Sequence, residues 1–145
     1  PDKDLAQCVR GRRVVQVDRR KGEIRDEDGV REKFGVAPEH IPDFLALVGD
    51  SADGFPGIPG IGKVTARRLI DAHGRIEDFP DEVLGERRAD ALLFKDLATL
   101  RTDAPLFDDI DELSWSGPTG SFGRWVERLE DDRLGERASA AAAAV

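Results

Sequence analysis

The sequence contains few of the features that mark secreted or membrane proteins. Cys8 is the single cysteine among 145 residues, which excludes an internal disulfide and suits a reducing cytoplasm. No apolar run is long enough to cross a bilayer, and the first residues show no signal-peptide pattern. We therefore expect a cytoplasmic protein with no membrane partner, in which Cys8 is a small buried hydrophobic residue.

Positive charge is also scarce relative to negative charge. The chain has 22 Lys and Arg against 30 Asp and Glu, a net charge of −8. This balance excludes binding to nucleic acid by bulk attraction, although carboxylates gathered around a metal ion do not repel a phosphate backbone. Local clusters of Arg and Lys matter more than the total. The chain has two histidines, and neither His40 nor His73 has a partner at metal-ligand spacing.

Most of the sequence has helical periodicity, and the length suits one domain with a modest core. We expect helices near residues 2–9, 26–34, 38–48, 63–72, 86–100 and 122–129. The β-branched run at 14–17 and the short stretch at 22–24 predict a hairpin. The expected fold class is therefore mainly α, within the α+β group. Residues 102–120 have the composition of a loop, and the alanine-rich end either extends the last helix or frays.

Apolar spacing predicts which faces of the helices are buried. In the helix at 63–72 the inward residues are expected to be Val64, Leu69 and Ile70, with Gly74 as a left-handed cap. In the helix at 86–100 the stripe consists of Ala89, Leu93, Leu97 and Leu100. Trp115 and Trp125 could stack on bases, but apolar packing is the preferred interpretation.

Four carboxylates are candidates for a metal site. If helical geometry persists to Asp53, the spacing of Asp50 and Asp53 places both on one helix face. Asp2 and Asp4 suit a turn or a strand end, from which both reach one cavity. Taken alone, Asp2 and Asp4 are better explained as a helix cap plus a solvated charge, and an Asx-turn after a helix is a common alternative for Asp50 and Asp53. Clustered Asp is the ligand type that Mg²⁺ prefers.

A glycine-rich turn follows at residues 57–66, GIPGIGKVTA. Gly60 and Gly62 allow a positive φ and leave backbone N–H groups bare at the start of a helix, which is a favourable site for phosphate. Lys63, Arg67 and Arg68 add positive charge there. The alternative is an ordinary tight turn between two helices.

Several motifs resemble, in order, the bacterial 5′→3′ exonuclease and flap endonuclease family, which includes the N-terminal nuclease domain of DNA polymerase I. They are DKDLAQ at 2–7, FLALVGDSAD at 44–53, GIPGIGKVTA at 57–66 and DLATLRTD at 96–103. The resemblance covers residues 2–106 and fades beyond Phe107. It implies the C-terminal half of a PIN-like 5′-nuclease fold that carries a helix–hairpin–helix module.

The resemblance also implies roles for individual residues. Asp2, Asp4, Asp50 and Asp53 match the family's catalytic metal ligands, which hold Mg²⁺ or Mn²⁺. The glycine-rich turn and the helix after it would contact DNA phosphates through a set of residues that comprises Gly60, Ile61, Gly62, Lys63, Thr65, Arg67 and Arg68. Carbonyls near Gly57 and Ile61 are candidates for a K⁺ site. Arg87, Arg88 and Lys95 could reach the second strand, or could simply be surface charges that support their helix.

The implied function is hydrolysis of DNA phosphodiesters near 5′ ends or flaps, in replication and repair, without sequence readout. Residues 1–36 would form the edge of the nuclease core, 37–106 the DNA-binding region, and 107–145 a C-terminal helix and tail. In the family further acidic ligands and an arch precede the DKD motif. We therefore expect a monomeric segment of a larger nuclease that is nearly inactive alone. The alternatives are a non-catalytic duplex-binding module and a protein-interaction domain that uses the acidic surface.

Overall fold

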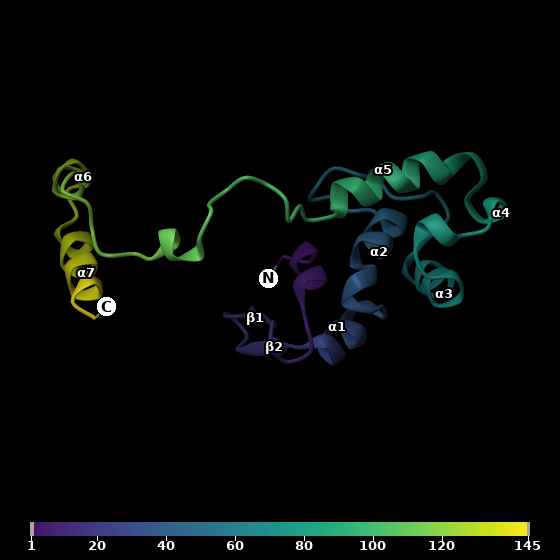
Figure 1. The fold of residues 1–145 in the computed structure, drawn as a ribbon, viewed down its shortest axis with the longest axis horizontal. Helices are drawn as coiled ribbons and strands as arrows, with labels where there is room; N and C mark the ends of the chain where they lie inside the picture. Colours follow the sequence, from purple (N-terminus) through teal and green to yellow (C-terminus); the bar gives the residue numbers. More distant parts are fainter. Residues whose placement is uncertain (1, 145) are drawn as a thin grey trace. The chain divides into compact units, whose positions relative to one another are not determined.

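The computed structural model describes residues 2–144. The chain divides between Thr102 and Asp103 into two compact units. The chain is mainly helical with one small sheet, so the expected fold class is confirmed (Figure 1). The elements of the first unit are η1 (Asp4–Cys8), β1 (Gln16–Asp18), β2 (Glu23–Arg25), α1 (Glu27–Phe34), η2 (Pro38–His40), α2 (Ile41–Val48), α3 (Lys63–His73), η3 (Ile76–Asp78), α4 (Asp81–Leu84), η4 (Gly85–Arg87) and α5 (Arg88–Ala98). The expected boundary at 36/37 lies inside this unit.

Local sequence signals account well for the start of the first unit. Strands β1 and β2 pair antiparallel with Val17 opposite Ile24, which confirms the predicted hairpin. Asp26 caps α1 by accepting a hydrogen bond from the Gly29 N–H at 3.1 Å. Gly35 ends α1 in the left-handed conformation, at a φ of 75°.

Helix α2 is the centre of the hydrophobic core. It is almost wholly buried and packs against α5 more extensively than any other pair of elements. Its single buried carboxylate, Asp43, is 1% exposed, accepts a hydrogen bond from the Ile76 N–H at 2.9 Å and forms an ion pair with Lys95 Nζ at 2.7 Å. Because a buried charge needs partners, this network fixes α2, η3 and α5 to one another.

Helix α2 ends at Val48, where the sequence predicted its end, and Gly49 follows with a φ of 90°. Asp50 then pairs through its backbone with Phe55, so residues 50–55 form a closed turn. The condition that helical geometry persists to Asp53 is therefore not met, because Gly49 takes a conformation outside the helix.

The predicted inward face of α3 is confirmed for Leu69 and Ile70, which pack in or against the core, but not for Val64, which is 69% exposed. The buried face of α5 differs from the expectation. The α5 stripe of Leu93, Leu97 and Leu100 lies at the surface together with Ala89, and the buried residues are Ala91 and Ala98. Ala91 and Ala98 leave room for the close approach of α2, and Leu92 and Phe94 are partly buried against the core.

Two single-residue expectations are corrected as well. Cys8 is exposed, since η1 is a short turn with only Ala6 buried. Gly74 has a positive φ of 79° but a ψ of −120°, so it ends α3 outside the left-handed helical region. The connection after Gly74 contains η3 and α4.

The second unit contains η5 (Ile110–Leu113), α6 (Phe122–Leu129) and α7 (Asp132–Ala142). Glu130, at a φ of 52°, separates α6 from α7, so the tail forms its own helix. Trp115 and Trp125 are 46% and 53% exposed, which does not support the expected apolar packing. Across the part of the chain that the structure describes, no helix has the length and apolar character needed to cross a membrane.

Candidate functional site

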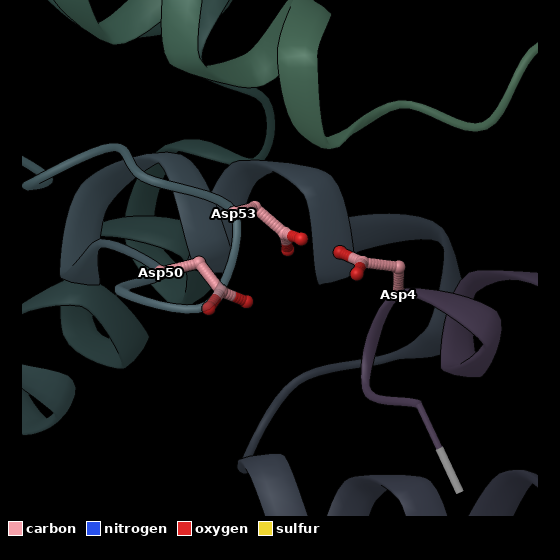
Figure 2. Close-up of side chains that lie close together, drawn as sticks. All are labelled: Asp4, Asp50 and Asp53. Atoms are coloured by element: carbon pink, nitrogen blue, oxygen red, sulfur yellow. The ribbon is translucent and has the colours of Figure 1, made fainter.

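Three of the four candidate carboxylates come together. Asp4, at the start of η1, meets Asp50 and Asp53 from the turn after α2, and their oxygens lie within 4.8 Å of one another. Figure 2 shows the three side chains pointing toward a shared space. Asp2 is exposed and lies next to this cluster, with Oδ1 accepting the Asp4 N–H at 3.4 Å.

Asp50 is the most firmly held of the three. It is 1% exposed, and its Oδ1 accepts the Ala52 N–H at 3.0 Å. The same oxygen forms an ion pair with the ammonium of Lys3. Burial alone would raise the pKa of Asp50, but the hydrogen bonds from Lys3 and Ala52 outweigh it and hold the pKa below its usual value. Asp50 is therefore ionised at neutral pH.

Asp4 has the opposite electrostatic environment. Burial, a hydrogen bond with Asp2 and the nearby charges of Asp53 and Asp50 together raise the pKa of Asp4 to about 6. Carboxylates brought this close repel each other unless a cation or a proton neutralises them. Asp4 Oδ1 and Asp50 Oδ2 are moreover buried without a hydrogen-bond partner among the described residues. Unpartnered buried oxygens are costly, so the cluster fits a hard divalent cation.

The turn at residues 57–62 lies in the same compact unit and opens to solvent. Gly60 has a φ of 83°, but Gly62 has a φ of −88° and is extended, which corrects the expected positive φ there. Gly62 is the N-cap of α3 and supplies no side-chain cap. The first N–H groups of α3 therefore remain free for an external acceptor. Lys63 and Thr65 are exposed on that turn, and Ile61 is half-buried.

The arginines near the turn divide into two groups. Arg68 is exposed on α3. Arg67 instead donates from Nε to the Phe34 carbonyl at 2.6 Å and lies 6.0 Å from the Phe44 ring. Its guanidinium therefore caps the end of α1, although it lies on the helix that follows the turn.

The basic residues of η4 and α5 are used inside the fold. Arg87 Nη1 donates to the Pro59 carbonyl at 2.8 Å, which braces the glycine-rich turn. Arg88 donates to the carbonyls of Phe79 and Glu77. Lys95 pairs with Asp43 and Glu77. Of the two interpretations of these side chains, the structure favours structural support.

Two supporting residues were not identified from the sequence. Lys3 neutralises Asp50, and its position between Asp2 and Asp4 in the motif was the available signal. Gln7 donates to the Ala98 carbonyl at 3.0 Å and accepts the Leu100 N–H at 3.0 Å, which ties η1 to the end of α5. No spacing rule predicts this long-range pair.

A family model for the 5′-3′ exonuclease, C-terminal SAM fold, matches residues 36–121. The chain belongs to this 5′-3′ exonuclease family. The resemblance seen in the sequence is thereby confirmed, and the matched region contains the turn at Asp50–Phe55, the glycine-rich turn, α3 and α5.

Three relatives of this exonuclease-family chain are named DNA polymerase I or 5′-3′ exonuclease. DNA polymerase I of Pseudomonas aeruginosa is 41% identical over 130 residues, which is 77% of this chain and 14% of that protein. DNA polymerase I of Bacillus caldotenax is 39% identical over 132 residues, 80% of this chain and 15% of that protein. The 5′-3′ exonuclease of Aquifex aeolicus is 38% identical over 110 residues, 71% of this chain and 38% of that protein. The chain thus spans a minor part of each relative's length.

Proposed function

We propose that this chain is the DNA-docking and partial metal-binding part of a structure-specific 5′→3′ exonuclease or flap endonuclease. Such an enzyme hydrolyses DNA phosphodiesters near 5′ ends in replication and repair. The observation that carries the proposal is that one compact unit contains three convergent carboxylates and an open N-terminus at α3. The family membership and the relatives' names support the substrate class.

Asp4, Asp50 and Asp53 would hold Mg²⁺ or Mn²⁺, with Asp2 available beside them. A bound divalent ion supplies a hydroxide nucleophile at neutral pH and stabilises the leaving oxygen. The chain's own contribution is to keep these carboxylates oriented: Ala52 and Lys3 fix Asp50, and Gln16 fixes the DKD segment by donating to the Asp2 carbonyl at 2.7 Å. Precise orientation of ligands raises metal affinity.

The glycine-rich turn would hold the duplex. The free N–H groups around Gly62 and Lys63 would donate to phosphate oxygens, assisted by the positive end of the α3 dipole. Gly60, Ile61 and Thr65 complete the contacting surface, and Arg67 and Arg68 add charge near it. Contacts of this kind fix the position of DNA without reading its sequence.

A potassium ion could bridge the turn and the DNA. Among residues 2–144, the carbonyls of Gly57 and Ile61 accept no hydrogen bond. Free carbonyl oxygens on one turn are suitable ligands for such an ion. The carbonyls of Gly57 and Ile61 are therefore the proposed ligands of K⁺ on this turn.

The surface of the first unit supports a role within a larger nuclease. Leu93, Leu97 and Leu100 form an exposed apolar stripe on and beyond α5. Apolar stripes of this kind commonly pack against another part of a protein. With three or four ligands, the chain alone would not complete a two-metal site, and we expect it to be nearly inactive in isolation.

Two variants of the 145-residue chain separate the two parts of the proposal. Asp53→Asn should weaken Mn²⁺ binding, measured by calorimetry, at least about tenfold and leave 5′-flap duplex affinity unchanged. Lys63→Gln should do the reverse, and the slope of log K against log salt should become shallower by about 0.9. Both side chains are exposed, so neither change should unfold the chain.

The outcomes distinguish the proposed function from its alternatives. Duplex binding without any Mn²⁺ binding would leave a non-catalytic docking module. Absence of duplex binding, with or without Mn²⁺, would reject the proposal and favour a protein-interaction domain. A loss that depends on DNA sequence in Lys63→Gln would contradict docking through phosphates.

A further inference from the structure

Residues 10–21 have a charge opposite to that of the whole chain. They contain six basic residues and one acidic residue, in a protein with 22 basic and 30 acidic residues. Three of the basic residues, Arg19, Arg20 and Lys21, form the turn between β1 and β2. All three are exposed, as are Arg12 and Arg13.

Most of this charge is not neutralised within the protein. Arg12 lies 3.5 Å from Asp26, and Arg10 donates to the carbonyls of Gln7 and Val9. Within residues 2–144, neither Arg13 nor any of the three turn residues has a carboxylate within 4.0 Å. Arg87 and Arg88, by contrast, donate to backbone carbonyls of the fold, those of Pro59 and Phe79.

The backbone of the turn is ordered by its own acidic residue. Asp18 Oδ1 accepts the N–H groups of Arg20 at 3.1 Å and Lys21 at 3.2 Å, and the Asp18 carbonyl accepts the Gly22 N–H at 2.8 Å. Gly22, at a φ of 69°, completes the turn. The three positive side chains therefore project from a fixed backbone, and an open hollow lies against them. A preorganised cluster loses less entropy on binding an anion.

The hairpin is attached beside the carboxylate cluster. Gln16 of β1 is 6% exposed and donates to the Asp2 carbonyl at 2.7 Å. In Figure 1 the hairpin and α3 lie at opposite ends of the first unit, with η1 between them in that view. A duplex held at α3 would therefore meet the hairpin turn as a second, separate contact.

We propose that the β1–β2 turn, through Arg19, Arg20 and Lys21, is a second docking surface for nucleic-acid backbone phosphates. It would extend the length of duplex in contact with the protein past the carboxylate cluster, away from the glycine-rich turn. This inference rests on the proposed function for the presence of DNA, but not for the identity of the residues. The contact would be insensitive to base sequence and strongly dependent on salt, because it consists of charges alone.

The test measures affinity for a long 5′-flap duplex against salt concentration, using the whole chain. The triple variant Arg19→Gln, Arg20→Gln, Lys21→Gln should bind roughly tenfold more weakly at moderate salt, with a slope shallower by up to about 2.7. The control variant Arg124→Gln, Arg133→Gln, Arg137→Gln removes the same charge from exposed positions of the second unit. It should bind like the wild type.

A gain-of-affinity variant makes the test independent of folding defects. Asp18→Asn keeps the side-chain oxygen that accepts the two N–H groups but removes the negative charge from the turn. It should bind the duplex a few-fold more tightly. A surface that is only solvated would leave the affinity unchanged.

Failure of this inference is distinguishable from failure of the proposed function. Wild-type affinity in the triple variant, together with weakened binding by Lys63→Gln, would overturn the second surface and leave docking at α3 intact. Equal losses in the triple and control variants would show a net-charge effect and would also overturn it. Binding of the turn to vesicles containing phosphatidylglycerol, without binding to duplex, would assign it to lipid headgroups instead.

Discussion

Gly60 and Gly62 lie two residues apart in the glycine-rich turn but have different backbone requirements. Gly60 needs the left-handed region, whereas Gly62 is extended, and an added Cβ meets no atom within 4 Å at either position. Gly60→Ala should therefore lower the free energy of unfolding by about 1–2 kcal/mol, and Gly62→Ala should leave it within about 0.5 kcal/mol. Urea unfolding measures both.

The same pair tests the phosphate contact. A Cβ at Gly62 would stand next to the first N–H groups of α3, so duplex affinity should fall about tenfold while stability is kept. Fluorescence anisotropy with flap DNA gives the affinity. Unchanged affinity in a fully folded Gly62→Ala would mean that the turn does not approach a phosphate closely.

Asp4 makes the stability of the metal-free chain depend on pH. Its folded pKa of about 6 exceeds the model-compound value of 3.8, so the folded chain keeps a proton that the unfolded chain has lost. The unfolding free energy contributed by Asp4 should therefore fall as pH rises from about 4 to about 6 and then level off. Thermal unfolding in the presence of a chelator, between these pH values, measures the effect.

Asp4→Asn is the matched control for this titration, because it keeps the shape of the side chain without an ionisable group. The difference between wild type and Asp4→Asn should change over the same pH range. A difference that is constant with pH would show that Asp4 titrates at an ordinary value and lies in a more solvated environment than the structure indicates.

At the scale of elements, helix α5 offers a direct test of which face is buried. Leu93 is 55% exposed and Ala91 is fully buried. Leu93→Ala should change stability by no more than about 0.5 kcal/mol, whereas Ala91→Leu should destabilise by about 1–3 kcal/mol through overpacking. If the stripe expected from the sequence faced the core, Leu93→Ala would instead lose about 2–5 kcal/mol.

Elements whose signals are local could be predicted, and the faces of helices could not. The cap at Asp26, the end at Gly35 and the β1–β2 hairpin depend on neighbouring residues alone. The buried side of α5 contains Ala91 and Ala98, with Phe94 partly buried against the core, and only the approach of α2 selects this side. Periodicity alone favours the stripe of Leu93 and Leu97 and therefore the wrong face.

The candidate site was predictable from residue type but not in its construction. Family motifs pointed to Asp4, Asp50 and Asp53, which the structure brings together. The helical spacing considered for Asp50 and Asp53 does not apply, because a turn closed by Asp50 and Phe55 follows α2. Within that turn Asp50 Oδ1 accepts the Ala52 N–H, as in the Asx-turn alternative. The ion pair of Lys3 with Asp50 depends on tertiary structure and has no local signal beyond its place in the motif.

For the whole molecule, the division between the two units predicts where proteases cut. Residues 103–109 are exposed, contain no helix or strand, and include Asp103, Asp108 and Asp109. Brief digestion with an endoprotease specific for Asp and Glu should cleave there first and release a resistant fragment corresponding to Pro1–Thr102. Mass spectrometry identifies the cuts, and first cleavage within α1, α2 or α5 would contradict the division.

The crossing of Gly49 and Gly57 has a consequence for where a bound strand would be cut. A Cβ at Gly49 would overlap the Pro56 backbone, and one at Gly57 would overlap Val48 and Gly49. The Ile58 N–H also donates to the Leu47 carbonyl at 2.9 Å. The segment with Asp50 and Asp53 is thus clamped to the segment with Gly60 and Gly62. If the glycine-rich turn docks a duplex and the carboxylates hold the metal, as proposed, this clamp would keep the offset, in nucleotides, between the phosphate held by the turn and the bond hydrolysed constant from substrate to substrate.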